Sequence, residues 1–533
     1  MRFGNIGVVM STRISFLKLS LICGLVLPVL LSGCATTVAD PLAAPLTAEQ
    51  SAVAVSITNN TTTAYKFDEL TVRRLGTGQE FLLKASVKLS SRDTNLFIGV
   101  LPAGEYQLVM LRDDSISTTL KLQDGPGLTG NFRVVGGAPT DLGRLIVAPI
   151  NFKALVGRSS RVLTNFPLIR NFAPAYAPLF EKEQLGGWIG PRHADDNIEE
   201  YARSRPGDAE CITETEGGLV LAGARLGTLM LRQPGGKWLA LGSTSVAALN
   251  CALPVKLPNA DFLVAGEFGT LLRHEKGEAA LRQVQTGDLP AGNLLRIIGN
   301  SQSGWYVANQ RGQTVTLYHS PELESGKWTE VRRDHVDRLL GNFEYRYWIW
   351  PTANGLAYTT GRGAIQMLDF ATKRWDTVAL PEKEAFSGLA LSPNGMLAMR
   401  AGLERHYVSH DGGKHWAQVK INIEGGGYVD VGSLQQRADG SMVFVGQNLD
   451  HKSILFRSRD QGRTWTAESR FRFRYRVTVL KSTPMLRTSD DNLDYFMSLS
   501  TSTDGDYWRE EFSTYDREYA KWEEERKAGK SAP

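Results

Sequence analysis

Six tryptophans recur at nearly regular intervals along the second half of the chain. The gaps between them are 90, 47, 41, 49 and 43 residues, and they are Trp238, Trp328, Trp375, Trp416, Trp465 and Trp508. The first gap is two periods long, and the segment 262–273 at its middle repeats the pattern of 219–231. Each unit contains an apolar run, a turn with Gly, a second apolar run and a tight turn. The pattern indicates seven units of about 45 residues built from short strands.

A repeat of this length and texture predicts a β-propeller with four-stranded blades. One such sheet cannot cover its own faces, so the blades must stack around an axis and bury the tryptophans between neighbours. A horseshoe or a β-helix is the alternative, but those folds use shorter repeats. We therefore expect a seven-bladed propeller over residues 207–513.

Residues 51–151 have a different pattern. Strand-like runs at 53–57, 80–84, 107–111 and 144–147 are separated by clusters of Asn, Thr, Gly and Asp. The run 101–108 reads Leu-Pro-Ala-Gly-Glu-Tyr-Gln-Leu. It resembles the Leu-Pro-x-Gly-x-Tyr turn and strand of prealbumin-like β-sandwich modules, which implies a small β-sandwich domain and nothing about activity. The expected fold class is all-β.

Two further segments flank the propeller. Residues 152–206 mix aromatics and prolines with a short helical pattern over 195–203, and we interpret them as a connector packed on the propeller. Residues 514–533 are highly charged, with Tyr519 and Trp522 as their main apolar anchors. This composition predicts a solvated tail helix.

The N-terminus carries an export signal. Arg13 and Lys18 precede an apolar run at 19–31 that ends on Leu-Ser-Gly-Cys at 31–34. This ending resembles the lipobox of bacterial lipoproteins, which implies that residues 1–33 are removed and that Cys34 carries a lipid. A membrane-spanning helix is the alternative, but it needs about 20 apolar residues. The resemblance, with Ala35 after the cysteine, favours outer-membrane attachment, and residues 34–50 are typical of a tether.

Charge excludes one class of partner. The segment 1–33 holds three of the 60 basic side chains and none of the 56 acidic ones, so the remainder carries 57 against 56. A protein that binds nucleic acid needs an excess of Lys and Arg to displace phosphate counterions. Nucleic-acid binding is therefore not expected. With 42% hydrophobic and 22% charged residues, the chain has the composition of an ordered globular protein.

The cysteine count is small. Cys23 leaves with the signal and Cys34 is assigned to the lipid, which leaves Cys211 and Cys251 in an oxidising compartment. They form either one disulfide or two buried thiols. A bridge over about 40 residues would contribute roughly 4 kcal/mol in the chain-entropy model. No Cys-x-x-Cys pattern is present in the sequence, so no structural zinc site is predicted.

Two of the predicted tight turns share a motif, Ser-x-Asp-x-Gly-x-Thr-Trp, with His415 replacing Thr in the first. Its residues are Ser409, Asp411, Gly413 and Trp416 in one turn, and Ser458, Asp460, Gly462, Thr464 and Trp465 in the other. The motif resembles the Asp-box of the BNR repeats in sialidase-like propellers. The resemblance implies a structural role, because Asp accepts backbone hydrogen bonds, Gly tolerates positive φ and Trp anchors the turn. A third turn, 501–508, is degenerate, with Asp504 one place late.

Candidate ligand-binding residues come from two unusual strands. Residues 470–476 alternate Arg with aromatics, which places Arg470, Arg472, Arg474 and Arg476 on one strand face. That face is either salt-bridged and solvated, or a groove for anions or glycans. Arg346 and Tyr347 lie in a second aromatic segment, 344–350, whose alternative is core packing between blades.

Catalytic chemistry is not evident in the pattern. Catalytic sialidases need an arginine cluster, a Tyr with a Glu partner and an acidic Asp, and the first arginine lies in an Arg-Ile-Pro motif that this sequence lacks. His406 and His410 are about 13 Å apart on a strand, too far to share a metal. No cofactor fingerprint appears in the sequence. We therefore predict no catalytic residues, no metal and no cofactor.

Two functions remain after these exclusions. The first is a non-catalytic outer-membrane lipoprotein whose propeller is a binding or assembly platform for an envelope partner. The alternative is a sialidase-like glycan-binding protein or glycoside hydrolase that uses Arg346 and the Arg472, Arg474 and Arg476 face. The expected contact with the membrane is through the lipid anchor.

Changing Cys34 to Ser should leave an uncleaved precursor, because the lipid is attached before the lipoprotein signal peptidase acts. Immunoblotting of fractionated cells measures both the size and the location of the protein. Normal processing and membrane retention of this variant would contradict the lipoprotein interpretation.

Overall fold

The computed structural model describes residues 35–527, except 62–66, 88, 90, 92, 115–116, 123–128, 152, 162, 183, 191–196, 325, 338–345, 384, 402–404, 422–427, 449–451, 472–474, 483–484 and 491–495. Cys34, Arg472 and Arg474 lie outside the described residues. In the part that is described, no helix is both long and apolar enough to span a membrane.

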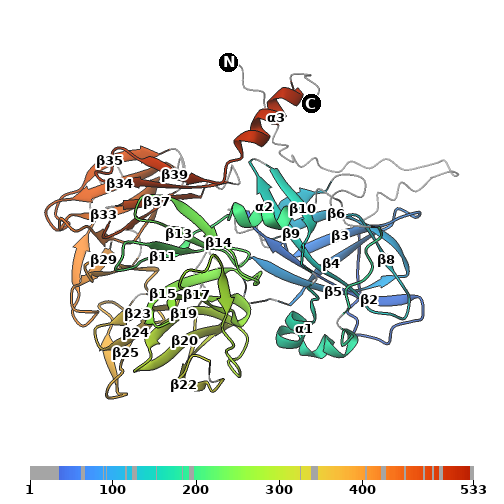
Figure 1. Ribbon diagram of the computed structural model, residues 1–533, viewed down its shortest axis with the longest axis horizontal. Helices are drawn as coiled ribbons and strands as arrows, with labels where there is room; N and C mark the ends of the chain where they lie inside the picture. Colours follow the sequence, from blue (N-terminus) through green and yellow to red (C-terminus); the bar gives the residue numbers. More distant parts are fainter. Residues whose placement is uncertain are drawn as a thin grey trace, which may run out of the picture. The chain divides into compact units, whose positions relative to one another are not determined.

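The N-terminal β domain is one nearly closed mixed sheet (Figure 1). Its strands are β1 (Thr36–Thr37), β2 (Gln50–Asn59), β3 (Glu69–Arg74), β4 (Glu80–Val87), β5 (Thr94–Pro102), β6 (Gly104–Asp113), β7 (Thr118–Lys121), β8 (Asn131–Val134), β9 (Thr140–Ile150) and β10 (Lys153–Arg158). The path runs β10-β9-β2-β5-β4-β3-β6-β7, with β1 beside β4 and β8 beside β6. Most neighbours are antiparallel, but β2 and β9, and β1 and β4, run parallel.

The Leu-Pro-x-Gly-x-Tyr run forms the corner between β5 and β6. Gly104 has a φ of 157°, and the hydroxyl of Tyr106 donates to the carbonyl of Pro102 at 2.7 Å. The Tyr106 ring is fully buried and stacks on Phe132 at 5.4 Å. The motif therefore fixes a strand turn and fills the core that the sheet encloses.

Segments at both ends of this domain differ from the sequence expectation. The predicted tether is ordered, since β1 pairs with β4 and Val38 packs against the domain core. At the other end, β10 extends the sheet beyond residue 151 by pairing with β9. Three short helices follow, α1 (Phe166–Phe172), the 3-10 helix η1 (Pro174–Leu179) and α2 (Ile198–Ser204).

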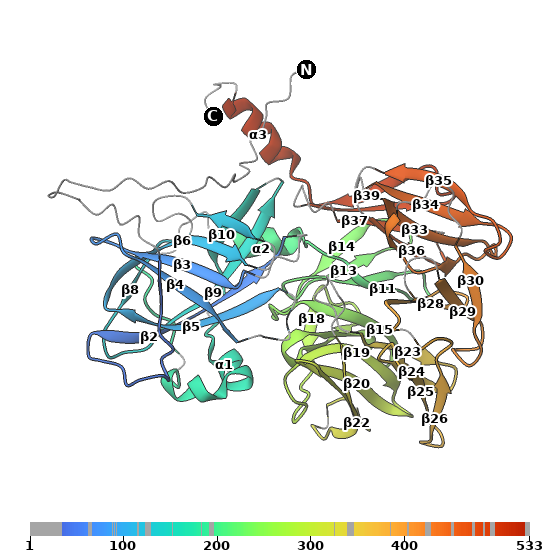
Figure 2. The same ribbon diagram turned by 180° about the vertical axis from the view of Figure 1, so that it is seen from behind.

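Seven sheets in chain order form the propeller, coloured from green to red in Figure 1 and seen from behind in Figure 2. Blades 1 to 3 are β11 (Glu210–Glu214), β12 (Val220–Gly223), β13 (Leu229–Arg232) and β14 (Trp238–Leu241); β15 (Leu249–Leu257), β16 (Ala260–Gly266), β17 (Leu271–Glu275) and β18 (Leu281–Gln283); and β19 (Asn293–Asn300), β20 (Gly304–Arg311), β21 (Thr314–Ser320) and β22 (Thr329–His335). Blades 4 and 5 are β23 (Trp348–Thr352), β24 (Gly355–Thr359), β25 (Ala364–Asp369) and β26 (Trp375–Ala379); and β27 (Gly388–Leu391), β28 (Leu397–Ala401), β29 (Arg405–Ser409) and β30 (Ala417–Lys420). Blades 6 and 7 are β31 (Tyr428–Val431), β32 (Gln435–Gln436), β33 (Met442–Asn448), β34 (Ser453–Ser458) and β35 (Thr466–Phe471); and β36 (Tyr475–Val479), β37 (Met485–Asp490), β38 (Met497–Ser502) and β39 (Arg509–Ser513). The predicted fold class, all-β with a seven-bladed propeller after a small β-sandwich domain, is confirmed as a mostly β chain with a seven-bladed propeller. The small domain is a nearly closed mixed sheet.

Apolar side chains fill the spaces between successive blades. Trp465, for example, packs against a cluster shared by blades 5 and 6 and meets the ring of Phe444 edge to face at 4.8 Å. Trp238 and Trp328 are buried, whereas Trp375, Trp416, Trp465 and Trp508 are half-buried. The predicted burial of the repeated tryptophans between blades is therefore correct for the first two and only partly correct for the other four.

The ring closes between blade 7 and blade 1. All four strands of blade 7 come from the C-terminal end of the chain, so closure depends on side chains rather than on a shared strand. Arg232 and Glu511 form a buried ion pair at 2.6 Å, and the indole of Trp238 donates to Glu511 at 3.1 Å. Burial alone would raise the pKa of Glu511, but hydrogen bonds from Arg232, Thr501 and Arg509 outweigh it and lower the pKa to about 2.

Antiparallel strands give the disc two distinct faces. The turns between first and second, and third and fourth, strands of each blade lie on one face, which carries the Asp-boxes and which we name the Asp-box face. The second-to-third turns and the loops between blades lie on the other, the domain face. The β domain and its connector contact the domain face, through Arg225 to the carbonyl of Asn59, Phe268 to Phe172, and Arg311 to the carbonyl of Asn171.

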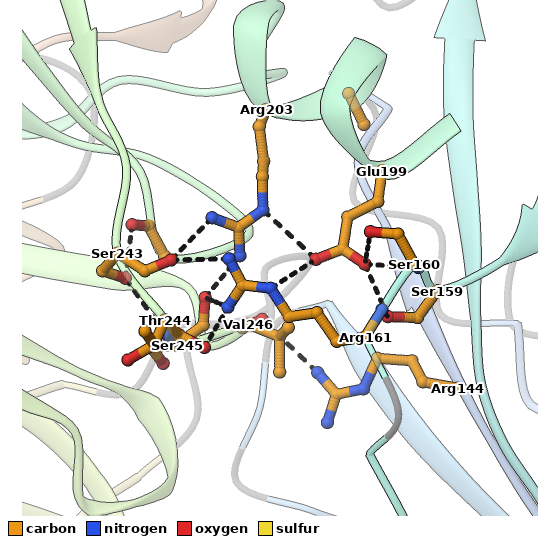
Figure 3. A network of polar contacts seen from close by, with 12 residues as sticks. Arg144, Ser159, Ser160, Arg161, Glu199, Arg203, Ser243, Thr244, Ser245 and Val246 are labelled. Carbon is orange, nitrogen blue, oxygen red and sulfur yellow. Dashed lines mark hydrogen bonds and ion pairs between the residues drawn. The ribbon is translucent and has the colours of Figure 1, made fainter. Parts of the chain in front are cut away.

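A group of arginines holds the loop between blades 1 and 2 (Figure 3). Arg161 and Arg203 both lie 3.2 Å from the buried carboxylate of Glu199. The same two guanidinium groups donate to backbone carbonyls of the β14–β15 loop, those of Ser243, Thr244 and Ser245, and Arg144 donates to that of Val246. Four successive carbonyl groups are therefore bound by three arginines of the β domain and connector.

The C-terminal helix α3 (Arg517–Lys527) is anchored at its start. The backbone N–H of Asp516 donates to Asn151 at 2.7 Å, and Lys153 pairs with Glu523. The chain end, for which a solvated tail helix was expected, forms a charged helix that Asp516 and Glu523 join to the β9–β10 hairpin.

Replacing Glu199 by Gln should lower the free energy of unfolding by about 3 kcal/mol or more at pH 7, because two arginines lose their shared carboxylate. Burial opposes ionisation of Glu199, but hydrogen bonds from Ser159 and the charges of Arg203 and Arg161 hold its pKa below the ordinary value. Its contribution is therefore present above about pH 4.3 and is lost as the pH falls further. Urea unfolding between pH 7 and pH 3 measures both effects.

The exposed neighbour Glu200 supplies the matched control, Glu200→Gln. A Glu199→Gln protein that unfolds at the wild-type urea concentration would show that the arginine group does not stabilise the structure.

Candidate functional site

A cavity of about 1360 Å³ lies along the inner strands of the propeller. The first strands of the blades line it, including residues of β11, β15, β19, β23, β27 and β36. Leu89 and Ser91 of the β domain also line it, and the Ser91 hydroxyl donates to Glu267 on the domain face at 2.9 Å. A cavity of this size is large enough for a small ligand or an extended segment of polypeptide.

Side-chain amides connect neighbouring inner strands around the cavity. The amide of Asn250 on β15 donates to the side chain of Asn293 and to the carbonyl of Leu294 on β19. Gln435 of blade 6 donates to the carbonyl of Val477 and accepts from the N–H of Val479 on β36. These bonds hold the wall of the cavity in place.

The two acidic residues on β11 already have partners. Glu210 pairs with Arg476 at 3.2 Å. Glu214 accepts the backbone N–H groups of Lys481 and Ser482 at 2.5 and 2.8 Å. Both carboxylates therefore join blade 1 to blade 7 at the inner edge of the ring.

Arg296 is the arginine that lines the cavity, among the residues described. Its guanidinium donates to the carbonyl of Ile349 on β23 at 3.2 Å. Burial lowers the pKa of Arg296 to about 10, so the side chain stays charged at neutral pH. The sequence interpretation missed this residue, although a charged side chain inside the apolar run 294–298 is a detectable signal.

The cavity continues into a groove between blades 4 and 5. Its wall includes Trp348, Met367 and Leu389, and it reaches the β23–β24, β27–β28 and β29–β30 turns on the Asp-box face. Leu391, at the end of β27, lines this groove with 41% of its surface exposed. Together with Trp348, Met367 and Leu389 it gives the groove an apolar wall, and concave sites with mainly apolar walls are common ligand sites.

The predicted ligand-binding residues are not brought together in the described structure. Tyr347 is buried, stacks on Tyr358 at 5.2 Å and lines the cavity, whereas Arg346 does not line it and donates its backbone N–H to the carbonyl of Asp337. Arg476 bonds Asp208 at 3.1 Å as well as Glu210. Arg472 and Arg474 lie outside the described residues.

The first Asp-box closes the β29–β30 turn. The hydroxyl of Ser409 donates to Asp411 at 2.8 Å and accepts the N–H of Gly413 at 2.9 Å. Asp411 accepts the backbone N–H of His415 at 3.0 Å, and the indole of Trp416 donates to the carbonyl of Gly413 at 2.9 Å. Each polar group of the motif is thus used within the turn.

The second Asp-box repeats the Ser and Asp contacts in the β34–β35 turn, but the indole N–H of Trp465 has no hydrogen-bond partner among the described residues. Ser458 donates to Asp460 at 2.7 Å and accepts the N–H of Gly462 at 2.7 Å. Thr464 donates both its backbone N–H and its hydroxyl to Asp460, at 2.9 and 2.6 Å. These bonds hold the pKa of Asp460 well below its usual range, so the carboxylate remains ionised and bound within the turn.

The third turn makes the same contacts, but its motif is one residue shorter. Ser502 donates to Asp504 at 3.0 Å and accepts the N–H of Gly505 at 2.8 Å, and the Trp508 indole donates to the carbonyl of Gly505. Aligning the motif from Thr501 placed Asp504 one position late, whereas the hydrogen bonds show that the motif begins at Ser502. The missing residue lies between Asp504 and Gly505.

Cys211 and Cys251 are joined by a disulfide in the described structure. The bridge connects β11 of blade 1 to β15 of blade 2, and both cysteines line the cavity. Within the residues that are described, no group of three His, Cys, Asp or Glu side chains is placed to hold a metal ion.

Comparison with known proteins gives the following. No protein-family model matches the chain, and no curated protein matches it. YCF48 from Cyanidioschyzon merolae is 12% identical over 53% of this chain and 92% of its own, with a TM-score of 0.39. YCF48 bound to D1 peptide is 13% identical over 55% of this chain and 91% of its own, with a TM-score of 0.38. A streptogramin B lyase is 12% identical over 55% of this chain and 93% of its own, with a TM-score of 0.38. These values assign no function to the chain.

Replacing Arg476 by Gln should reduce stability by no more than about 1 kcal/mol, because its ion pairs are partly exposed. It should leave ligand binding unchanged, because the guanidinium lies outside the cavity wall and its acidic partners are structural. Thermal melting and a binding assay on the purified variant measure the two effects. Loss of binding at wild-type stability would instead favour an anion-binding role for this strand.

Proposed function

We propose that this chain is a non-catalytic, lipid-anchored envelope protein whose propeller is a binding or assembly platform for a partner protein. The partner inserts an extended segment into the central cavity through the groove between blades 4 and 5. The observation that carries the proposal is this cavity of about 1360 Å³, which continues to an exposed apolar side chain at Leu391.

The lining of the cavity supports binding of polypeptide. It combines aromatic and apolar side chains, such as Trp348 and Leu389, with backbone groups of the inner strands. Its acidic residues on β11 take part in contacts between blades. Large aromatic side chains beside a groove are the residues that contribute most to protein interfaces.

The arrangement of the faces also supports the proposal. The β domain and its connector contact the domain face at blades 1 to 3, through Arg225, Phe268 and Arg311. The groove of blades 4 and 5 reaches the opposite, Asp-box face. A partner can therefore approach the groove without displacing the β domain.

A lipid on Cys34 would hold the β domain close to the membrane. The first strand, β1, begins at Thr36, two residues after the cysteine. Two residues of extended chain span about 7 Å at most. The domain would thus lie at the membrane surface rather than on a long tether.

Photo-cross-linking tests the proposed platform directly. The photoreactive amino acid p-benzoylphenylalanine is placed at position 391 of the full-length protein, and intact cells are irradiated. We expect an adduct with an envelope protein, because residue 391 lies in the groove.

The matched control carries the same amino acid at Tyr507, which is 74% exposed and lies outside the cavity wall. If position 391 gives no more adduct than position 507, the groove is not a binding site for a partner.

A further inference from the structure

The strand β19 has an irregularity beside a charged residue that lines the cavity. Its register with β20 shifts between Leu294 and Arg296, which is a β-bulge. Leu295 and Arg296 both line the cavity. Bulges are over-represented beside functional sites.

Arg296 has little compensation for its charge. Its hydrogen bond in the described structure goes to a neutral carbonyl, that of Ile349. No ion pair joins it to a carboxylate among the described residues, and Glu210 and Glu214 of the same cavity are bound elsewhere. A guanidinium has five N–H donors in a planar fork, so several remain available to a ligand.

Three other arginines at contacts between blades or between the domains have acidic partners. Arg232 has Glu511, while Arg161 and Arg203 share Glu199. Arg296 instead faces an open volume within the ring. A charge in such a position is unfavourable unless an opposite charge enters the cavity. The cavity wall therefore provides the cation of an ion pair, and a ligand would provide the anion.

We infer that Arg296 binds a carboxylate of the polypeptide segment that enters the cavity. This inference rests on the proposed function. A guanidinium binds a carboxylate through two parallel hydrogen bonds. The apolar wall around Trp348 and Leu389 contacts the neighbouring side chains of the segment. The carboxylate belongs either to an Asp or Glu side chain or to the C-terminus of the partner.

The test combines the cross-linker at position 391 with three substitutions in the full-length protein. Arg296→Met removes the charge at similar length, and Arg296→Lys retains it. Arg282→Met is the control, because Arg282 lies on β18 and is 57% exposed. We expect Arg296→Met to reduce the adduct about tenfold or more, since loss of a buried charged partner weakens binding strongly. Arg296→Lys should retain most of the adduct, and Arg282→Met all of it.

Melting temperature separates a binding role from a structural one. The purified Arg296→Met protein should melt at or above the wild-type temperature, because an uncompensated charge has been removed. An undiminished adduct in Arg296→Met, or a lower melting temperature that accounts for its loss, would overturn the inference. Absence of any adduct in the wild type would contradict the proposed function itself.

Mass spectrometry of the adduct then identifies the partner segment and distinguishes the two sources of the carboxylate. In one arm, Asp and Glu of that segment are changed to Asn and Gln. In the other, the C-terminus of the partner is extended with Gly and Ser. One of these changes should reproduce the loss seen with Arg296→Met, and failure of both would overturn the carboxylate assignment.

Discussion

Closure of the ring is the constraint on which the rest of this structure depends. Each four-stranded blade has two apolar faces that only its neighbours can cover, so the last blade must meet the first. The contact includes an apolar cluster, the buried pair of Arg232 and Glu511, and the bonds of Glu210 and Glu214 to blade 7. Seven inner strands are thereby fixed around one axis, which creates the cavity and determines which side chains face it.

The β domain adds a second constraint. Arginines of this domain and its connector bind four successive carbonyl groups of the β14–β15 loop, and Glu199 provides the charge that two of them require (Figure 3). The domain therefore contacts the propeller at one face and at the first blades. The groove of blades 4 and 5 reaches the other face, which separates the proposed binding site from the membrane-proximal domain.

Sequence analysis predicted the features that depend on local pattern. The tryptophan spacing predicted the blades, and the Asp-box residues predicted their tight turns, because each turn satisfies its own hydrogen bonds. The features it missed depend on residues far apart in the chain. Arg232 and Glu511 are 279 positions apart, and Arg296 lines a cavity that forms only when the blades close into a ring. The shortened third Asp-box was misread by one residue because only its hydrogen bonds reveal that it begins at Ser502.

Hydrogen–deuterium exchange on the purified protein, with and without its isolated partner, tests the central claim that the ring of inner strands is the binding site. We expect the partner to slow exchange at residues 348–354 and 389–395, the inner strands and turns of blades 4 and 5 that line the groove. Exchange in the outer strands and the β domain should remain unchanged. Protection confined to the β domain, with no change in these inner strands, would contradict the account.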